Sequence, residues 1–142
     1  MMPRNLEMVT MIDFETHQDD RGSLVAIESS KNIPFDIKRI YYLFKNNPSQ
    51  TRAKHAHKKL KQVYIAMSGS CKIRLDDGEK QEVVTLDKAN VGMLFNGLVW
   101  REIFDFSEDC VLMVLADEFY EEEDYLKTYE EFLEFRKLNI KQ

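Results

Sequence analysis

Apolar, aromatic and β-branched residues occur along most of this chain in short runs, each about the length of a strand and bounded by turn-forming residues. Asp77-Gly78 is a clear turn signal, because Asp-Gly between two such runs is typical of a β-hairpin. Several strands at nearly regular spacing predict a sandwich or barrel. The expected strands are Leu24–Ile27, Ile37–Phe44, Gln62–Ala66, Cys71–Leu75, Glu82–Leu86 and Val111–Ala116.

The pattern changes near the C-terminus. Tyr125, Tyr129, Phe132 and Phe135 recur every three or four residues, which predicts a helical tail over about residues 122–138. The acidic run at residues 121–124 fits the N-terminus of that helix, where carboxylates meet the positive end of the dipole, and we assign it no chemistry. The 142 residues are expected to form one domain, with its barrel over about residues 8–118.

Composition argues against a nucleic-acid-binding protein and against a membrane protein. A formal charge of −5 argues against general affinity for nucleic acid, which requires a basic surface. The longest apolar run, Cys110–Ala116, is far shorter than the roughly 20 residues that span a bilayer, so no membrane segment is expected. The N-terminal residues lack an apolar signal core, which favours the cytoplasm. Cys71 and Cys110 belong to no paired motif and are interpreted as small buried side chains.

Candidate chemistry is concentrated around two histidines. His55 and His57 are two residues apart, so in a strand both imidazoles point to the same face. They could bind a metal, transfer protons near neutral pH or pack as ordinary core residues. Basic residues surround them without an intervening acid, which indicates either an anion site or a solvated basic edge.

The residues around this pair resemble the first signature of the cupin β-barrel. His55-x-His57 is followed by Gln62 and Gly69, and the second signature runs from Gly92 to Arg101. Metal-binding cupins ordinarily have Glu where this chain has Gln62, and His where it has Arg101. Because a guanidinium stays charged and has no free lone pair, Arg101 cannot be a ligand. We therefore expect no metal and no other cofactor, and interpret the imidazoles as proton-transfer groups.

A closer resemblance covers most of the chain. It is similar to the metal-free cupins that act as 3,4-ketoisomerases on dTDP-4-keto-6-deoxyglucose. This resemblance implies an all-β cupin barrel of the double-stranded β-helix (jelly-roll) type with a C-terminal helix, a dTDP-linked keto sugar as substrate, and a homodimer with exchanged strands. It also implies a supply of dTDP-3-amino-3,6-dideoxyhexose for surface polysaccharide. The segments that carry it are Arg21–Glu28, Ile37–Tyr42, Arg52–Lys59, Gly69–Cys71, Leu75–Gly78, Val99–Glu102, Asp105–Ser107 and Asp109–Ala116.

The implied reaction needs a base for the proton on C3, a group that moves the hydroxyl proton between oxygens, and donors that stabilise the oxyanion. We assign His55 as the carbon base and His57 as the shuttle, although the reverse assignment fits the sequence nearly as well. Strand parity adds Tyr64 to the face of Gln62. Tyr64 could line the sugar or thymine, or pack as core.

Cationic and aromatic residues complete the expected substrate site. Arg39 and Tyr41 share one strand face and are preferred for the pocket. Arg39 and Arg52 suit pyrophosphate because a guanidinium offers a planar fork of donors, although either could form a surface ion pair. Arg21 and Arg101 occupy positions at which family members tend to differ when their products have opposite configurations at C4. Since this chain has Arg at both positions, the C4 configuration of its product stays open.

Two other functions are compatible with the residues. One is a metal-dependent cupin enzyme, either an oxygenase or an isomerase, in which the two histidines retain a metal. The other is a non-catalytic cupin that binds a sugar nucleotide without turning it over.

Overall fold

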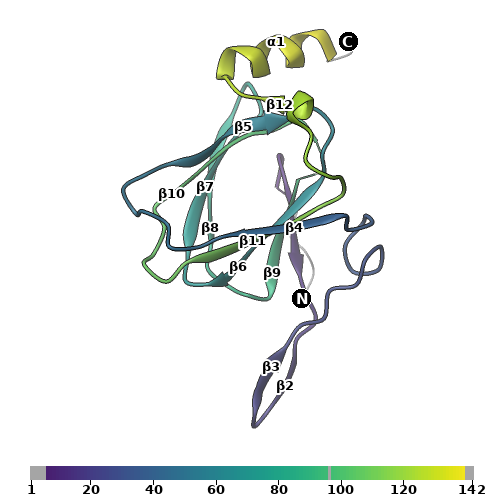
Figure 1. The fold of residues 1–142 in the computed structure, drawn as a ribbon, viewed down its shortest axis with the longest axis vertical. Coiled ribbons are helices and arrows are strands. Elements are labelled where there is room, and N and C mark those ends of the chain that lie inside the picture. Colours follow the sequence, from purple (N-terminus) through teal and green to yellow (C-terminus); the bar gives the residue numbers. More distant parts are fainter. Residues whose placement is uncertain (1–5, 96, 140–142) are drawn as a thin grey trace.

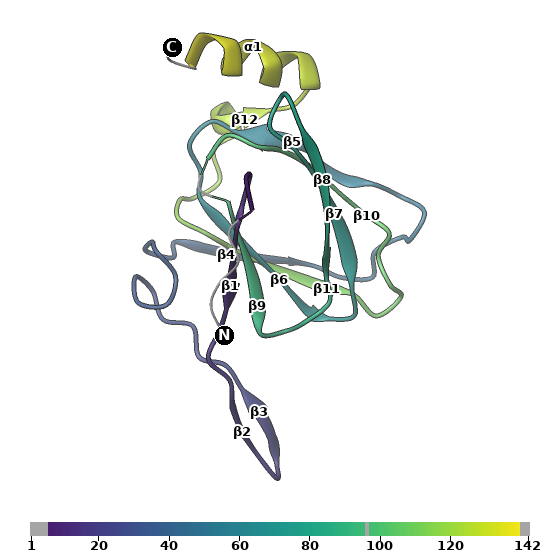
Figure 2. The same ribbon diagram turned by 180° about the vertical axis from the view of Figure 1, so that it is seen from behind.

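The computed structural model describes residues 6–95 and 97–139. Within them, two antiparallel five-stranded sheets face each other to form a barrel, as Figures 1 and 2 show from opposite sides. The strand order is β1-β9-β6-β11-β4 in one sheet and β12-β5-β10-β7-β8 in the other. The strands are β1 (Thr10–Asp13), β2 (His17–Asp19), β3 (Gly22–Leu24), β4 (Arg39–Leu43), β5 (Arg52–His57), β6 (Gln62–Ser68), β7 (Cys71–Asp76), β8 (Gln81–Leu86), β9 (Val91–Phe95), β10 (Trp100–Phe104), β11 (Val111–Ala116) and β12 (Tyr125–Leu126).

The barrel interior is filled by the inward side chains of both sheets. Tyr64, Ile73, Phe95 and Leu112 are each almost completely buried in one cluster. Their alternation along the strands is what period-two patterning predicts. Both cysteines lie in this cluster as free thiols, as the sequence indicates. The all-β fold with a C-terminal helix is confirmed.

The segment before β4 departs from the predicted strand. Residues 25–28 form no strand, and Val25 and Ile27 instead pack with Phe35 on the outer face of the β6–β11 sheet. In the part of the chain that the structure describes, the shorter strands β2 and β3 pair only with each other. Their hairpin projects away from the barrel in Figures 1 and 2. The prediction of a strand at Leu24–Ile27 is therefore wrong for most of its length, because tertiary packing decides the conformation there.

The C-terminal segment begins its α-helix later than the periodicity predicts. Residues Glu122–Asp124 form a 3₁₀ turn, β12 then pairs with β5, and α1 spans Tyr129–Asn139. Thr128 and Glu131 cap α1 reciprocally: the Glu131 N–H donates to the Thr128 hydroxyl, and the Glu131 carboxylate accepts from the Thr128 N–H. In Figure 1, α1 crosses the end of the barrel beside β5.

Strand β5, which carries both histidines, is irregular in its first half. The register of β5 against β10 shifts between the pairs Arg101↔His55 and Ile103↔Arg52, which leaves an extra residue on β5. Ala53 adopts φ 57°, a left-handed conformation that non-glycine residues rarely take. The bulge therefore re-aims β5 just before its histidines. In the described part of the chain, no helix has the length and apolar character needed to cross a membrane.

Candidate active site

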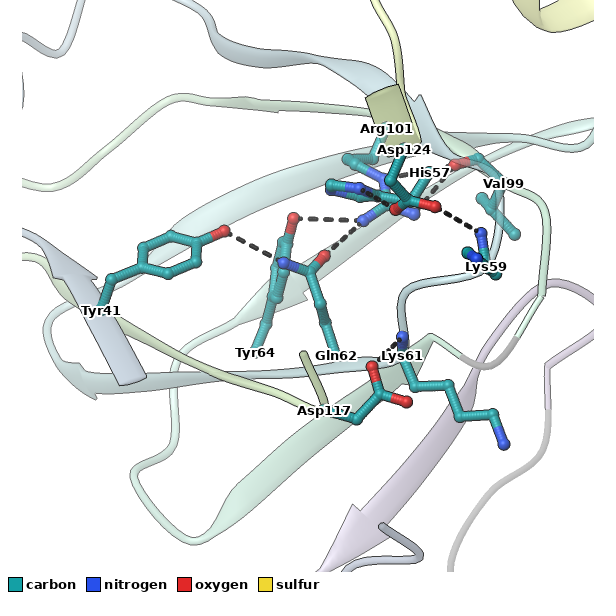
Figure 3. Close-up of polar contacts among 10 residues, drawn as sticks. All are labelled: Tyr41, His57, Lys59, Lys61, Gln62, Tyr64, Val99, Arg101, Asp117 and Asp124. Carbon is teal, nitrogen blue, oxygen red and sulfur yellow. Dashed lines mark hydrogen bonds and ion pairs between the residues drawn. The ribbon is translucent and has the colours of Figure 1, made fainter. Parts of the chain in front are cut away.

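Four strands bring the candidate site residues together at the β12 end of the barrel. β5 carries both histidines, β6 carries Gln62 and Tyr64, and Arg101 on β10 pairs directly with His55 on β5. β4 contributes Tyr41, whose hydroxyl meets the Gln62 side chain in Figure 3. Side chains distant in sequence thus converge because the two sheets face each other.

The two imidazoles lie edge to face, with ring centroids 4.7 Å apart. The Tyr125 ring packs against both, at 5.0 Å from His55 and 4.4 Å from His57. The Nε2 atoms of both histidines are buried and have no hydrogen-bond partner within the described protein. Leaving a buried polar atom without a partner costs about 1–3 kcal/mol of folding free energy. Because the folded protein already bears this cost, a ligand that bonds either Nε2 atom displaces no hydrogen bond of the described protein.

The electrostatic surroundings keep both imidazoles neutral. Burial and then the positive charge of Arg101 lower the pKa of His55 to about 3. Burial, followed by Arg101, His55 and Arg39, lowers the pKa of His57 to about 2, although the Asp124 carboxylate 3.0 Å away favours its charged form. At neutral pH both imidazoles are therefore unprotonated and keep a lone pair on one ring nitrogen, although burial also makes them weaker bases than a free imidazole.

Arg101 is a fully buried cation held by neutral groups. Its Nη1 donates to Gln62 Oε1 at 2.8 Å and to the Tyr64 hydroxyl at 3.4 Å. Its Nε and Nη2 both donate to the Val99 carbonyl, at 3.2 and 3.0 Å. The guanidinium carbon lies 4.1 Å from the Phe95 ring centroid. No carboxylate of the described residues forms an ion pair with it. Arg101 therefore contributes a buried positive charge that could stabilise an oxyanion.

A cavity of about 410 Å³ opens beside this cluster. Arg39, His57, Asp124 and Tyr125 contribute to its lining. Arg39 lies over the ring of Tyr41, and its Nε is buried without a partner. The Tyr41 hydroxyl accepts a hydrogen bond from Gln62 Nε2 at 3.1 Å, and burial raises its pKa. His57 is the histidine that lines this cavity, and His55, Tyr41 and Arg101 belong to the buried cluster beside it. Together the cavity and the cluster hold the group types that can move protons next to a carbonyl and stabilise the resulting enediolate.

The donor set is poorly suited to a divalent cation. Gln62 offers an amide in place of a carboxylate, and its oxygen is already bonded to Arg101. In residues 6–95 and 97–139, no three His, Cys, Asp or Glu side chains gather as a metal site requires. The expectation of a metal-free, cofactor-free enzyme stays a prediction.

Comparison with known proteins places the chain in a family. The sequence model described as "FdtA: WxcM-like, C-terminal" matches residues 7–137. The chain belongs to this family. Its curated relative from Aneurinibacillus thermoaerophilus is a TDP-4-oxo-6-deoxy-alpha-D-glucose-3,4-oxoisomerase, which is 49% identical over 131 residues, or 92% of this chain and 94% of the relative.

Solved structures of 3,4-ketoisomerases superpose closely on this chain. A variant of the 3,4-ketoisomerase QdtA from Thermoanaerobacterium thermosaccharolyticum, in complex with TDP-4-keto-6-deoxyglucose, has a TM-score of 0.92 and 43% identity, covering 97% of this chain and 100% of that protein. The TDP-quinovose 3,4-ketoisomerase WlaRB from Campylobacter jejuni has a TM-score of 0.86 and 42% identity, covering 91% and 99%. The resemblance to ketoisomerases that the sequence motifs indicate is thereby confirmed.

Two of the predicted substrate residues lie elsewhere in the chain. Arg21 is on the projecting β2–β3 hairpin, where its side chain is 90% exposed and bonds Asp19. Arg52, at the start of β5, is exposed, and its Nη1 contacts Asn46 Oδ1 at 3.4 Å. Neither lines the cavity beside His57 within a single chain.

Sequence reasoning missed Asp124 and Tyr125. Tyr125 has the spacing of a helical core residue, yet it pairs with His57 as part of β12. Asp124 belongs to an acidic run that we interpret from sequence as a solvated helix N-terminus, but it is buried against His57. No local pattern distinguishes Asp124 from its acidic neighbours, because its burial follows from the pairing of β12 with β5.

Proposed function

We propose that this protein is a sugar-nucleotide 3,4-ketoisomerase that moves the keto group of dTDP-4-keto-6-deoxyglucose from C4 to C3. The observation that carries the proposal is the pair of neutral imidazoles, His55 and His57, whose free Nε2 atoms lie beside the buried Arg101 cation. Relatives at 42–49% identity are 3,4-ketoisomerases, which supports the same reaction here. A metal-dependent cupin is less favoured, because Gln62 and Arg101 bond each other where ligands would be needed.

In the proposed mechanism His55 removes the proton from C3, which the adjacent C4 ketone acidifies. The resulting enediolate carries its charge on the former carbonyl oxygen, and the positive field of Arg101 stabilises it. His57 takes the proton from the C3 hydroxyl and delivers it to the oxygen on C4. Protonated His55 then returns a proton to C4, so the carbonyl ends on C3 with no external oxidant or reductant.

Substrate recognition is assigned to the groups around the cavity. Arg39 has an unpartnered buried Nε and a planar donor fork, which suits a phosphate of the nucleotide. Gln62 donates to Tyr41, and Arg101 donates to both Gln62 and Tyr64; we assign this hydrogen-bonded group to the sugar. The product supplies a dTDP-3-amino-3,6-dideoxyhexose for surface polysaccharide, and we place the reaction in the cytoplasm.

We further propose that the active form is a homodimer with exchanged strands. Ile40, Tyr42 and Phe44 leave 56%, 60% and 55% of their surfaces exposed on the outer face at the β4 edge, and large apolar side chains in such a row favour an interface. Among the described residues of its own chain, the β2–β3 hairpin pairs with no further strand. Exchange of this hairpin would carry Arg21 toward the other chain's site, in agreement with its predicted substrate role.

Turnover by a matched pair of variants tests the reaction. His55→Asn should reduce the rate of keto-sugar isomerisation at least about 10²-fold while leaving the fold intact, because general base catalysis contributes about 10²–10⁴. Lys54→Asn introduces the same side chain one residue earlier on the exposed face and should keep full activity. Full activity of His55→Asn would contradict the proposal.

Complementation tests the exchanged dimer. Arg21→Ala and His55→Asn should each form inactive homodimers that elute at the dimer mass. After unfolding and refolding together, mixed dimers should contain one intact site, made of Arg21 from one chain and His55 from the other. Recovery of about one quarter of wild-type activity follows from random pairing. No recovery, or a monomeric mass, would overturn this arrangement.

A further inference from the structure

His57 makes a buried contact with Asp124 through Nδ1, the ring nitrogen that the proposed mechanism does not use. His57 Nδ1 lies 3.0 Å from Asp124 Oδ2, with 1% and 7% of the two side chains exposed. The second oxygen of the same carboxylate accepts the Lys59 backbone N–H at 2.9 Å. The Asp124 carbonyl accepts the Lys58 N–H, also at 2.9 Å. Figure 3 shows this carboxylate held between the imidazole and the Lys59 backbone. Two contacts therefore fix the carboxylate, and a third fixes the backbone of the same residue.

The arrangement decides which nitrogen of His57 carries the proton. An ionised carboxylate only accepts hydrogen bonds, so in the neutral imidazole the proton lies on Nδ1 and the lone pair on Nε2. Nε2 is buried and has no partner among the described residues. Arg101 does not compete for it, because the hydrogen bonds of that guanidinium go to Gln62, Tyr64 and Val99. Nε2 is thus prepared to accept a proton from a ligand in the cavity.

A purely structural histidine would not require this geometry. Burial of an acid and an imidazole in contact has a desolvation cost that packing alone does not favour. An orphaned Nε2 adds about 1–3 kcal/mol to that cost. Asp124 is the last residue of the 3₁₀ turn, and β12, which follows directly, is only two residues long and pairs with β5 at His57 itself. The pairing of β12 with β5 therefore brings this carboxylate against the imidazole.

We propose that Asp124 is a positioning residue for the isomerisation. It holds His57 in the Nδ1–H tautomer and orients the ring, so that Nε2 takes the proton of the C3 hydroxyl and passes it to the oxygen on C4. Asp124 stays ionised throughout and stabilises the imidazolium that exists between the two transfers. This inference rests on the proposed ketoisomerase function, but the tautomer is a property of the free protein and is measurable without substrate.

The experiment combines ring nitrogen NMR with kinetics of three proteins. In wild type, the ¹⁵N spectrum of the free protein should show protonated Nδ1 and unprotonated Nε2 for His57. Asp124→Asn should present an amide N–H₂ to Nδ1 and shift the proton to Nε2. Its kcat should fall about 10²–10⁴-fold with KM nearly unchanged, because a wrong tautomer removes the acceptor and not the binding contacts. Glu123→Gln alters an exposed neighbour in the same acidic run and should change neither quantity.

Each outcome decides the proposal. A wild-type His57 protonated on Nε2 overturns it even if Asp124→Asn does not fold. An Asp124→Asn protein with an unchanged tautomer, or with wild-type kcat, also overturns it. If the wild-type protein shows the expected tautomer but no isomerase activity, the proposed function fails while the structural assignment of Asp124 stands.

Discussion

Arg101→Met replaces the buried guanidinium with an apolar side chain of similar length. Two buried acceptors, Gln62 Oε1 and the Val99 carbonyl, lose their donors at 2.8 and 3.0–3.2 Å. At about 1–3 kcal/mol for each unsatisfied acceptor, the loss amounts to about 2–6 kcal/mol. Against this, the variant no longer buries an unpaired cation, whose desolvation costs several kcal/mol. Because the two effects are of similar size, the free energy of unfolding should change by less than about 2 kcal/mol.

Catalysis should respond much more strongly than stability. If the Arg101 charge stabilises the enediolate, its removal should lower kcat about 10²–10³-fold, the usual effect of losing one such donor. The same charge lowers the pKa of both His55 and His57. The pH below which kcat/KM falls should therefore move upward in Arg101→Met.

Urea unfolding, steady-state kinetics and a pH profile of the same preparation separate these effects. Arg74→Met is a matched control on β7, because this arginine is partly exposed and outside the cavity. A folded Arg101→Met protein with wild-type kcat would refute the oxyanion role. A protein that loses its fold would instead show that the cation is a structural counter-charge in the barrel.

Three further predictions concern stability and pH. The folded-state pKa values of His55 and His57, about 3 and about 2, lie below the ordinary value near 6.5, so the unfolded chain binds more protons below pH 6.5. Urea unfolding should therefore show the free energy of unfolding falling by up to about 4 kcal/mol from pH 7 to pH 5. In His57→Asn the fall should be about half as large. Gly69→Ala should lower the free energy of unfolding by about 2–5 kcal/mol, because φ is +65° and a Cβ would lie 2.9 Å from Cys110 Cα. In Gly97→Ala the new Cβ meets nothing within 4 Å, so thermal unfolding of this variant should be unchanged. Phe132→Ala should lower the free energy of unfolding by about 3–5 kcal/mol, because the ring is fully buried beside Trp100. Leu133→Ala changes a neighbour that is 37% exposed and should lower it far less. Equal losses would contradict the packing of α1 on the barrel.

The alternation of side chains between the two faces of a strand was the strongest guide in predicting the site residues from the sequence. His55 and His57 could be placed on one face from their spacing, and Arg39 with Tyr41 likewise, because period two holds wherever a strand is regular. It does not hold across the bulge at Ala53, where an extra residue changes the direction of the strand. The position of Arg52 therefore could not be derived from parity with the histidines.

The residues that sequence reasoning missed depend on long-range pairing. Tyr125 and Tyr129 are four apart, which indicates a helix, but pairing of β12 with β5 overrides that local preference. Burial of Asp124 follows from the same pairing, and no local pattern records it. Arg21 illustrates a different limit, since its hairpin leaves its own barrel and its predicted role requires a second chain.

Isomerisation in deuterated water tests the central claim most directly. The wild-type protein, treated with a chelator, is incubated with dTDP-4-keto-6-deoxyglucose in D₂O, and the product is trapped by a 3-aminotransferase and analysed by NMR. The account predicts an amino group on C3 and deuterium on C4, with the C4 configuration read from the same spectrum. A carbonyl that remains on C4, or turnover that returns only when a divalent metal is added, would contradict it.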